Sequence, residues 1–164
     1  MPRRFIILFT FISLALPAMV AHLQATPVVI SKPDHQITSS PLDAVAISTD
    51  GTLIVSGGRD NVVRLWNAAT SDLRGQMLGH TAWVTRVAIS SDKRTIASGS
   101  QDTTVRLWDA ATFTLRATLA HHTGSVTGVA FSPDGRLLAT TGLDGIIWIG
   151  EAATGKELAR LNNF

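Results

Sequence analysis

Residues 98–109 read SGSQDTTVRLWD, and this stretch decides the fold because close copies of it recur on both sides. Residues 56–67 read SGGRDNVVRLWN, and residues 140–151 read TGLDGIIWIGEA. The aspartates of the three copies are spaced 42 residues apart: Asp60, Asp102 and Asp144. A constant period of this length is typical of an array built from one repeated supersecondary unit.

Each repeated unit contains four short apolar stretches separated by turn residues. The units follow one another without a gap as residues 38–79, 80–121 and 122–163. In the second unit the stretches are residues 86–90, 95–99, 105–108 and 114–119, and turn-forming Ser, Asp and Gly residues lie between equivalent stretches. No segment of the units shows a helical period of apolar residues. The pattern predicts all-β units of four strands, repeated radially.

The first 25 residues have the order of a secretory signal peptide. Arg3 and Arg4 precede an apolar run at residues 5–20, and small residues follow it. The run is 16 residues long, between the usual hydrophobic core of a signal and the roughly 20 residues of a membrane-spanning helix. The break at Pro17 and the small residues favour cleavage over retention as an N-terminal anchor. We therefore expect a secreted or periplasmic protein, membrane-anchored if the segment is uncleaved. Residues 26–37 are predicted to be either a linker or an extra strand at the edge of the array.

The composition limits the classes of function. Hydrophobic residues make up 45% of the chain and charged residues 16%, as in a folded domain. The formal charge of +2 comes from 14 basic and 12 acidic residues, and Arg3 and Arg4 account for the surplus. We therefore predict no nucleic-acid partner. The chain has no cysteine, which excludes disulfides and thiolate chemistry.

The second unit resembles the WD40 repeat family, and the resemblance extends over residues 38–163. Gly79 and His80 open the unit, Ser98 lies on its second strand, Asp102 lies in the next turn, and Trp108 and Asp109 close the third strand. In that family the equivalent residues form a hydrogen-bonded chain that is structural and not catalytic. The resemblance implies WD40-type four-stranded blades in an incomplete, three-blade β-propeller, preceded by the hydrophobic signal segment.

The outer units depart from this pattern. The first has Ser56, Asp60 and Trp66, but Thr38 stands where the His would be. The third has His122, Thr140 and Asp144, but Gly150 occupies the Trp position. Trp148 lies two residues earlier, on the same face of the strand. We expect Trp148 to fill part of the vacated space without closing the chain, which would leave His122 or Thr140 partly hydrated.

Other chemical motifs have structural explanations. Residues 150–156 read GEAATGK, but Glu157 follows where a phosphate loop needs Ser or Thr, and the parallel segments of the other units indicate a turn. His121 and His122 would point to opposite faces of a strand, and no third ligand is placed near them. We predict no catalytic residue, no cofactor and no metal.

The resemblance also implies a partner-binding surface, since partners of the family usually lie across the loops at one end of the blades. The implied residues are Arg59, Trp83, Thr85, Gln101, Ser125, Thr127 and Leu143. Trp83 is the best candidate, because its counterparts Pro41 and Ser125 show that the core does not require a large residue there. Trp and Arg are also common interface anchors. The alternative is that Trp83 packs against a neighbouring loop.

These observations predict a non-enzymatic interaction scaffold, exported from the cytoplasm, that binds a protein or peptide. The alternative is a fragment or regulatory part of a larger extracytoplasmic propeller protein whose enzymatic activity lies in other segments. Propellers typically have 4 to 8 blades. The chain supplies three, fewer than a closed propeller needs. This number is explained if the chain is part of a longer propeller, if a homodimer closes six blades, or if the three blades form an open array.

Overall fold

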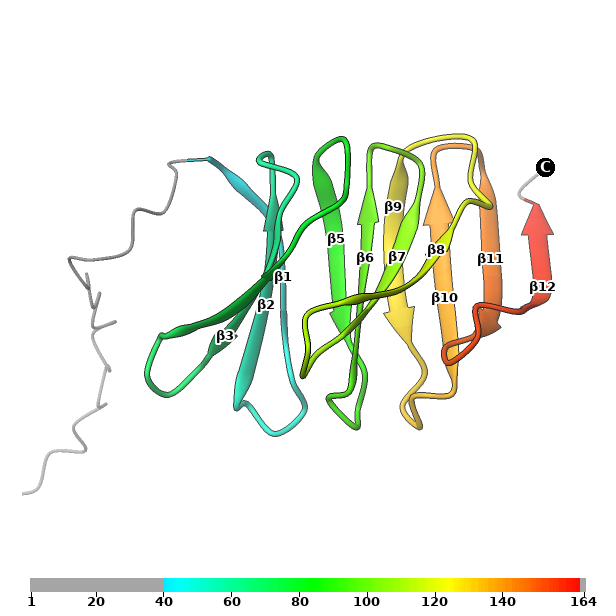
Figure 1. Ribbon diagram of the computed structural model, residues 1–164. Coiled ribbons are helices and arrows are strands. Elements are labelled where there is room, and N and C mark those ends of the chain that lie inside the picture. The colour runs from blue at the N-terminus through cyan, green and yellow to red at the C-terminus, as the bar shows by residue number, and fades with distance from the viewer. Residues whose placement is uncertain (1–39, 163–164) are drawn as a thin grey trace, which may run out of the picture. The chain divides into compact units, whose positions relative to one another are not determined.

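The computed structural model describes residues 40–162 as three four-stranded antiparallel sheets in chain order (Figure 1). Blade 1 contains β1 (Leu42–Ile47), β2 (Leu53–Gly58), β3 (Val63–Asn67) and β4 (Leu73–Met77). Blade 2 contains β5 (Val84–Ile89), β6 (Thr95–Ser100), β7 (Val105–Asp109) and β8 (Leu115–Leu119). Blade 3 contains β9 (Val126–Phe131), β10 (Leu137–Gly142), β11 (Ile146–Glu151) and β12 (Glu157–Asn162).

The expected all-β fold with four strands per unit is confirmed. The predicted signal or anchor of residues 1–25, the linker of residues 26–37 and Thr38 lie outside the described residues. Residues 40–162 contain no helix long and apolar enough to cross a membrane.

The turns between the first two strands of each blade form because a serine and an aspartate bond the chain locally. In blade 2, Ser90 Oγ donates to Asp92 Oδ1 at 2.6 Å, and the backbone N–H of Arg94 donates to the same oxygen at 2.9 Å. Gly51 and Gly135 take positive φ values of 71° and 72° in the equivalent turns, and Lys93 takes 60°. The turn therefore tolerates Lys93 in place of glycine.

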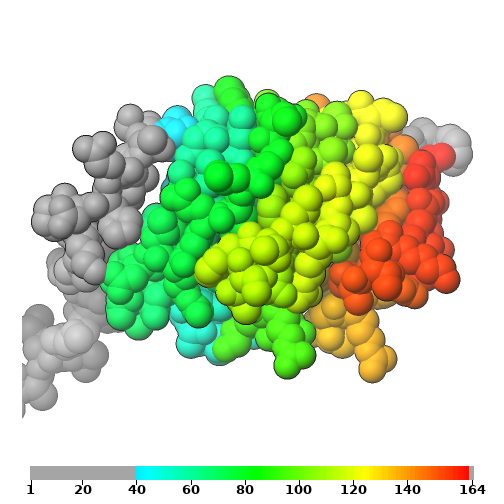
Figure 2. Space-filling view, in the orientation of Figure 1, coloured from blue at the N-terminus to red at the C-terminus, as the bar shows by residue number. Residues whose placement is uncertain are grey.

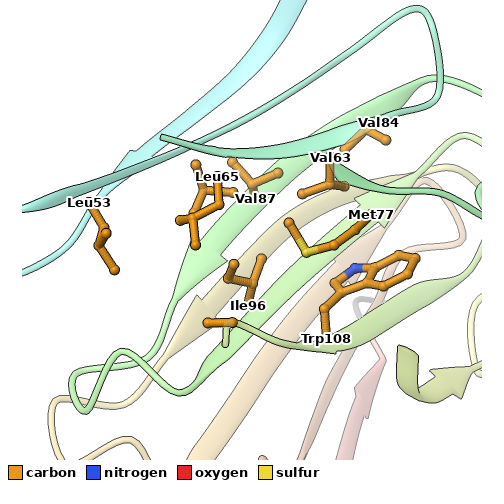
Figure 3. Packing of buried hydrophobic residues seen from close by; sticks show 10 residues of the cluster. Leu53, Val63, Leu65, Met77, Val84, Val87, Ile96 and Trp108 are labelled. Carbon is orange, nitrogen blue, oxygen red and sulfur yellow. The ribbon is translucent and has the colours of Figure 1, made fainter. Parts of the chain in front are cut away.

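The core lies between the blades. The first strands of neighbouring blades contact one another, β1 against β5 and β5 against β9, and the space-filling view shows the blades side by side in chain order (Figure 2). Val63, Met77 and Trp108 belong to the apolar cluster between blades 1 and 2 (Figure 3). A second cluster joins blades 2 and 3. Each blade is thus stabilised by its neighbour.

We call the contact between two neighbouring blades a junction. At each junction, a valine of one blade lies over a glycine of the preceding blade. A Cβ atom at position 57 would lie 2.4 Å from Val84 Cγ1, and one at position 99 would lie 2.4 Å from Val126 Cγ1. Only glycine permits so close an approach. Across the second junction, Thr85 Oγ1 also donates to the carbonyl oxygen of Val126 at 2.6 Å.

The outer face of blade 1 exposes apolar side chains. We call the side of a blade that faces the preceding blade its leading face, and the opposite side its trailing face. On the leading face of blade 1, Leu42, Val45 and Ile47 are 54%, 73% and 61% exposed. Their equivalents in β5 include Val84 and Val87, which are buried against blade 1. The trailing face of blade 3 carries Thr141 at the position that Gly57 and Gly99 hold in the other blades.

Candidate functional site

Blade 2 holds an unbroken chain of side-chain hydrogen bonds. The indole Nε1 of Trp108 on β7 donates to Ser98 Oγ on β6 at 2.8 Å. His80 Nε2 lies 2.8 Å from the same oxygen, and His80 Nδ1 lies 2.7 Å from Asp102 Oδ2 in the β6–β7 turn. Ser98 and Trp108 are buried. The chain thus ties the loop before β5 to β6, to β7 and to the turn between them.

The direction of each proton in this chain follows from the donor and acceptor types. A carboxylate only accepts, so His80 donates from Nδ1 to Asp102, and its Nε2 accepts the hydroxyl proton of Ser98. Burial lowers the pKa of His80 and keeps the ring neutral. Burial acts to raise the pKa of Asp102, but donors that include Thr104 and His80 outweigh it and lower the pKa to about 2. Every group has a structural partner, as a structural role requires.

Blade 1 has a shorter version of this chain. Trp66 Nε1 donates to Ser56 Oγ at 2.8 Å. Arg64 Nη2 lies 2.6 Å from Asp60 Oδ2, and Arg64 is buried. This role of Arg64 was not predicted, although Arg64 lies four residues after Asp60 in the sequence. Arg64 supplies the buried positive charge beside the turn aspartate, where blade 2 has a neutral histidine.

Blade 3 replaces the missing tryptophan with two other side chains. Trp148 is buried, and its ring occupies the space next to Gly150, where an added Cβ would lie 2.1 Å from Trp148 Cη2. Its Nε1 donates to Glu157 Oε2 at 3.0 Å, so Trp148 does not close the chain, as expected. The expected hydration of His122 or Thr140 is wrong, because both are buried and Thr140 is 0% exposed.

His121 takes the place of the indole N–H. Its Nε2 lies 2.8 Å from Thr140 Oγ1, and His122 Nε2 lies 2.9 Å from the same oxygen. His122 Nδ1 faces both oxygens of Asp144 at 3.0 and 3.1 Å, so His122 donates there and accepts the hydroxyl proton of Thr140. His121 must therefore donate its Nε2 proton to Thr140. Its ring also stacks on Trp148, with centroids 4.2 Å apart and planes 9° apart.

The prediction that His121 and His122 point to opposite faces of a strand is wrong. Both residues lie in the loop between β8 and β9, where side chains do not alternate, and both rings reach the same hydroxyl. Within residues 40–162, no three potential metal ligands lie together. Residues Thr154 and Gly155 of the segment that resembles a phosphate loop form the turn between β11 and β12, and Gly155 N donates to Glu151 O at 2.8 Å.

We expect blade 3 to lose stability as the pH falls. Burial and the neighbouring His122 and Arg160 lower the pKa of His121 to about 4, from 6.5 in the unfolded chain. The unfolded chain therefore binds the proton first, and the free energy of unfolding decreases between about pH 6.5 and 4 by on the order of 1 kcal/mol. Urea unfolding of the wild type and of His121→Gln at pH 7 and pH 5 measures this difference.

The His121→Gln variant is the matched control, since an amide also donates an N–H to Thr140 but does not titrate. Its stability should depend less on pH than that of the wild type over the same interval. Contributions from His80 and from carboxylates remote from His121 are common to both proteins and cancel. Equal slopes for the two proteins would show that His121 is not held neutral by the fold.

The predicted partner-binding residues gather near one end of the blades. We define the loop face by Arg59, Trp83, Gln101 and Leu143. The guanidinium of Arg59 in blade 1 lies 4.3 Å from the ring centroid of Trp83 before β5, and Arg59 Nε lies 3.2 Å from Asp43 Oδ2. Trp83 remains 39% exposed. The alternative, that Trp83 packs against a neighbouring loop, therefore holds in part, because Arg59 lies over the Trp83 ring.

A repeated backbone bond positions the loop face in every blade. The N–H groups of Arg59, Gln101 and Leu143 donate to the carbonyl oxygens of Pro41, Trp83 and Ser125 at 3.0, 2.9 and 2.9 Å. The side chains of Gln101 and Leu143 are exposed, and Ser125 is half-buried. The bond holds the two loop positions of each blade together.

Two other predicted residues have structural bonds. Thr85 is half-buried, and its hydroxyl joins blade 2 to blade 3 through the Val126 carbonyl. Thr127 Oγ1 lies 3.1 Å from Thr141 Oγ1 within blade 3. Partner binding at all seven residues stays a prediction.

The structure consists of three antiparallel four-stranded sheets that pack side by side, and one of them contains the hydrogen-bonded chain of Trp, Ser, His and Asp. This arrangement defines a protein of the β-propeller repeat class. The family model described as "WD domain, G-beta repeat" matches residues 28–67, 72–109 and 113–149. The chain belongs to the WD40 family, and the resemblance noted in its sequence is confirmed.

Two examples represent the solved structures that share this fold. The one described as "Structure of U3-55K" has a TM-score of 0.73 at 22% identity, over 76% of this chain and 40% of its own. The one described as "Crystal structure of RRP9 WD40 repeats" has a TM-score of 0.72 at 22% identity, over 76% of this chain and 39% of its own. The chain spans about two-fifths of the length of these structures.

Proposed function

We propose that this chain is a non-enzymatic scaffold that binds a protein or peptide through its loop face. The observation that carries this proposal is the pair formed by Arg59 and Trp83. The pair joins two blades, and the indole keeps a large exposed surface that the fold does not need. Pro41 and Ser125 occupy the equivalent positions in the other blades.

The chemistry of the pair supports recognition of a peptide. An exposed indole offers a rigid apolar surface, and Arg59 holds it in one orientation at little entropic cost. Leu143, which is 75% exposed, adds an apolar contact on blade 3, and Gln101, whose N–H donates to the Trp83 carbonyl, adds an exposed polar side chain. A partner that presents an apolar side chain beside a carboxylate fits this surface.

We also propose that the scaffold is exported. Support comes from residues 1–25, in which two arginines, an apolar run and small residues follow in the order of a signal peptide. Cleavage would leave a secreted or periplasmic protein, and retention would leave a membrane-anchored one.

Peptides selected from a random phage library against the wild-type protein provide the test. We expect Trp83→Ala to weaken binding of the selected peptides by about tenfold or more, as for an interface anchor. Fluorescence anisotropy measures the affinity, and urea unfolding measures stability, which should change by no more than about 1 kcal/mol.

Leu115→Ala is the matched control, since Leu115 is an exposed apolar residue on β8, outside the loop face. It should leave peptide affinity unchanged. A Trp83→Ala protein that is less stable but binds the peptides normally would show that Trp83 only packs against its neighbours, and the proposal would fail.

A further inference from the structure

A groove lies at the opposite end of the blades from the loop face, between blades 1 and 2. It has a volume of about 840 Å³, and the turns between β1 and β2, β3 and β4, β5 and β6, and β7 and β8 line it. Leu53 and Ala110, both buried residues of the core, form part of its lining, together with Ala68, Ala69 and Ala111. Its interior is therefore partly apolar.

The charged part of the lining is more basic than acidic. Four basic side chains line the groove against two carboxylates, those of Asp92 and Asp109: Arg74, Lys93, Arg94 and Arg116. Lys93 Nζ pairs with Asp50 Oδ2, and Arg116 Nη2 pairs with Asp109 Oδ2, both at 2.5 Å. Within residues 40–162, Arg74 and Arg94 form no ion pair.

A comparison of blades 1 and 2 explains why Arg74 lacks a carboxylate. Arg74 is the equivalent of Arg116, and Asn67 is the equivalent of Asp109. Asp109 Oδ1 accepts the backbone N–H groups of Ala111 and Thr112 at 2.8 and 2.9 Å, and its second oxygen binds Arg116.

Asn67 performs only the first of these two tasks. Its Oδ1 accepts the N–H groups of Ala69 and Thr70 at 2.9 and 3.2 Å, so the turn is kept. Its amide has no charge to neutralise Arg74. The chain therefore preserves the turn in blade 1 while it leaves the Arg74 guanidinium without a carboxylate partner at this groove.

We infer that this groove binds an acidic peptide segment, in which carboxylates pair with Arg74 and Arg94 and an apolar side chain lies over the alanines. A guanidinium binds a carboxylate through two parallel hydrogen bonds, and the pair strengthens next to an apolar lining. The volume and the apolar lining fit a peptide better than a small inorganic anion, which would use only the charges.

The test uses a labelled peptide, Leu-Asp-Glu-Leu-Glu-Asp, and its amide counterpart, Leu-Asn-Gln-Leu-Gln-Asn, with the full chain. We expect the acidic peptide to bind and the amide peptide not to bind. The Asn67→Asp variant should lose about tenfold or more in affinity, because it gives Arg74 the internal carboxylate that Arg116 has. Its thermal stability should match the wild type, since Asp can accept the same two N–H groups.

Arg136→Gln is the matched control, because it changes the net charge by the same amount and its side chain is 86% exposed outside the groove. It should keep the wild-type affinity. Equal losses in Asn67→Asp and Arg136→Gln would overturn the proposal in favour of general charge attraction. Displacement of the acidic peptide by an equal concentration of inorganic phosphate would overturn the assignment to a peptide. Trp83→Ala should bind this peptide normally, so the groove and the loop face are tested separately.

Discussion

The Gly99→Thr variant should lose about 3 kcal/mol of its free energy of unfolding, with a melting temperature about 10 °C lower or more. A Cβ at position 99 would lie 2.4 Å from Val126 Cγ1 and 2.9 Å from Val129 Cγ2. Val126 is buried, so its side chain has no free space into which to rotate. The blades must separate to admit the threonine, and the apolar cluster between blades 2 and 3 then loses contacts. Urea unfolding followed by far-ultraviolet circular dichroism measures the loss.

The sign of this effect distinguishes the clash from strand propensity. Threonine favours a strand over glycine by up to about 1 kcal/mol, so propensity alone would stabilise the variant. The Val126→Ala substitution removes the methyl groups that collide, and it should rescue Gly99→Thr in part. The double variant should therefore lose less stability than the two single variants added together. Strictly additive losses would show that the valine and the glycine do not limit the approach of the blades.

A homodimer that closes six blades stays a prediction. The contact of valine over glycine between blades indicates how well such a dimer would pack. In such a dimer the leading face of blade 1, with Leu42, would meet the trailing face of blade 3, with Thr141. The two internal junctions place a valine over a glycine, whereas this one would place a leucine over a threonine. Both side chains are larger than those at the internal junctions, so the contact would be looser unless the strands shift.

The sequence predicted the strands and turns well because both depend on local rules. Alternating apolar residues predict a strand, and a serine with an aspartate two residues later predicts the tight turn that Ser90 and Asp92 form. The chain of His80, Ser98, Asp102 and Trp108 was also accessible, since each donor needs an acceptor of the right type and the repeat places them in register.

The roles of His121, Arg64 and Asn67 were not predicted, because they depend on contacts outside the strand rules. His121 lies in a loop, where its direction cannot be inferred from alternation. Arg64 pairs with Asp60 across four residues, and the strand pattern does not distinguish this pair from an exposed arginine. Thr85 was assigned to the loop face, but its hydroxyl reaches a carbonyl of the next blade, and the spacing within one unit contains no information about that distance.

The Trp108→Ala variant should lose about 4 kcal/mol of its free energy of unfolding. Trp108 is one of the largest buried side chains, and it packs in the cluster between blades 1 and 2. Its removal leaves a cavity and also leaves Ser98 Oγ without the indole N–H donor. Because repeat arrays unfold in parts, hydrogen exchange at β6 and β7 should accompany urea unfolding as a local measure of blade 2.

Two further variants separate packing from hydrogen bonding at this position. Trp108→Phe keeps most of the ring but lacks the N–H, and it should lose about 1–2 kcal/mol. Trp66→Ala changes the equivalent residue of blade 1, which is less buried although it donates to Ser56 in the same way, and it should cost less than Trp108→Ala. If Trp66→Ala cost as much as Trp108→Ala, burial between two blades would not explain the effect. If Trp108→Phe cost as much as Trp108→Ala, the hydrogen-bonded chain would outweigh the packing of the ring.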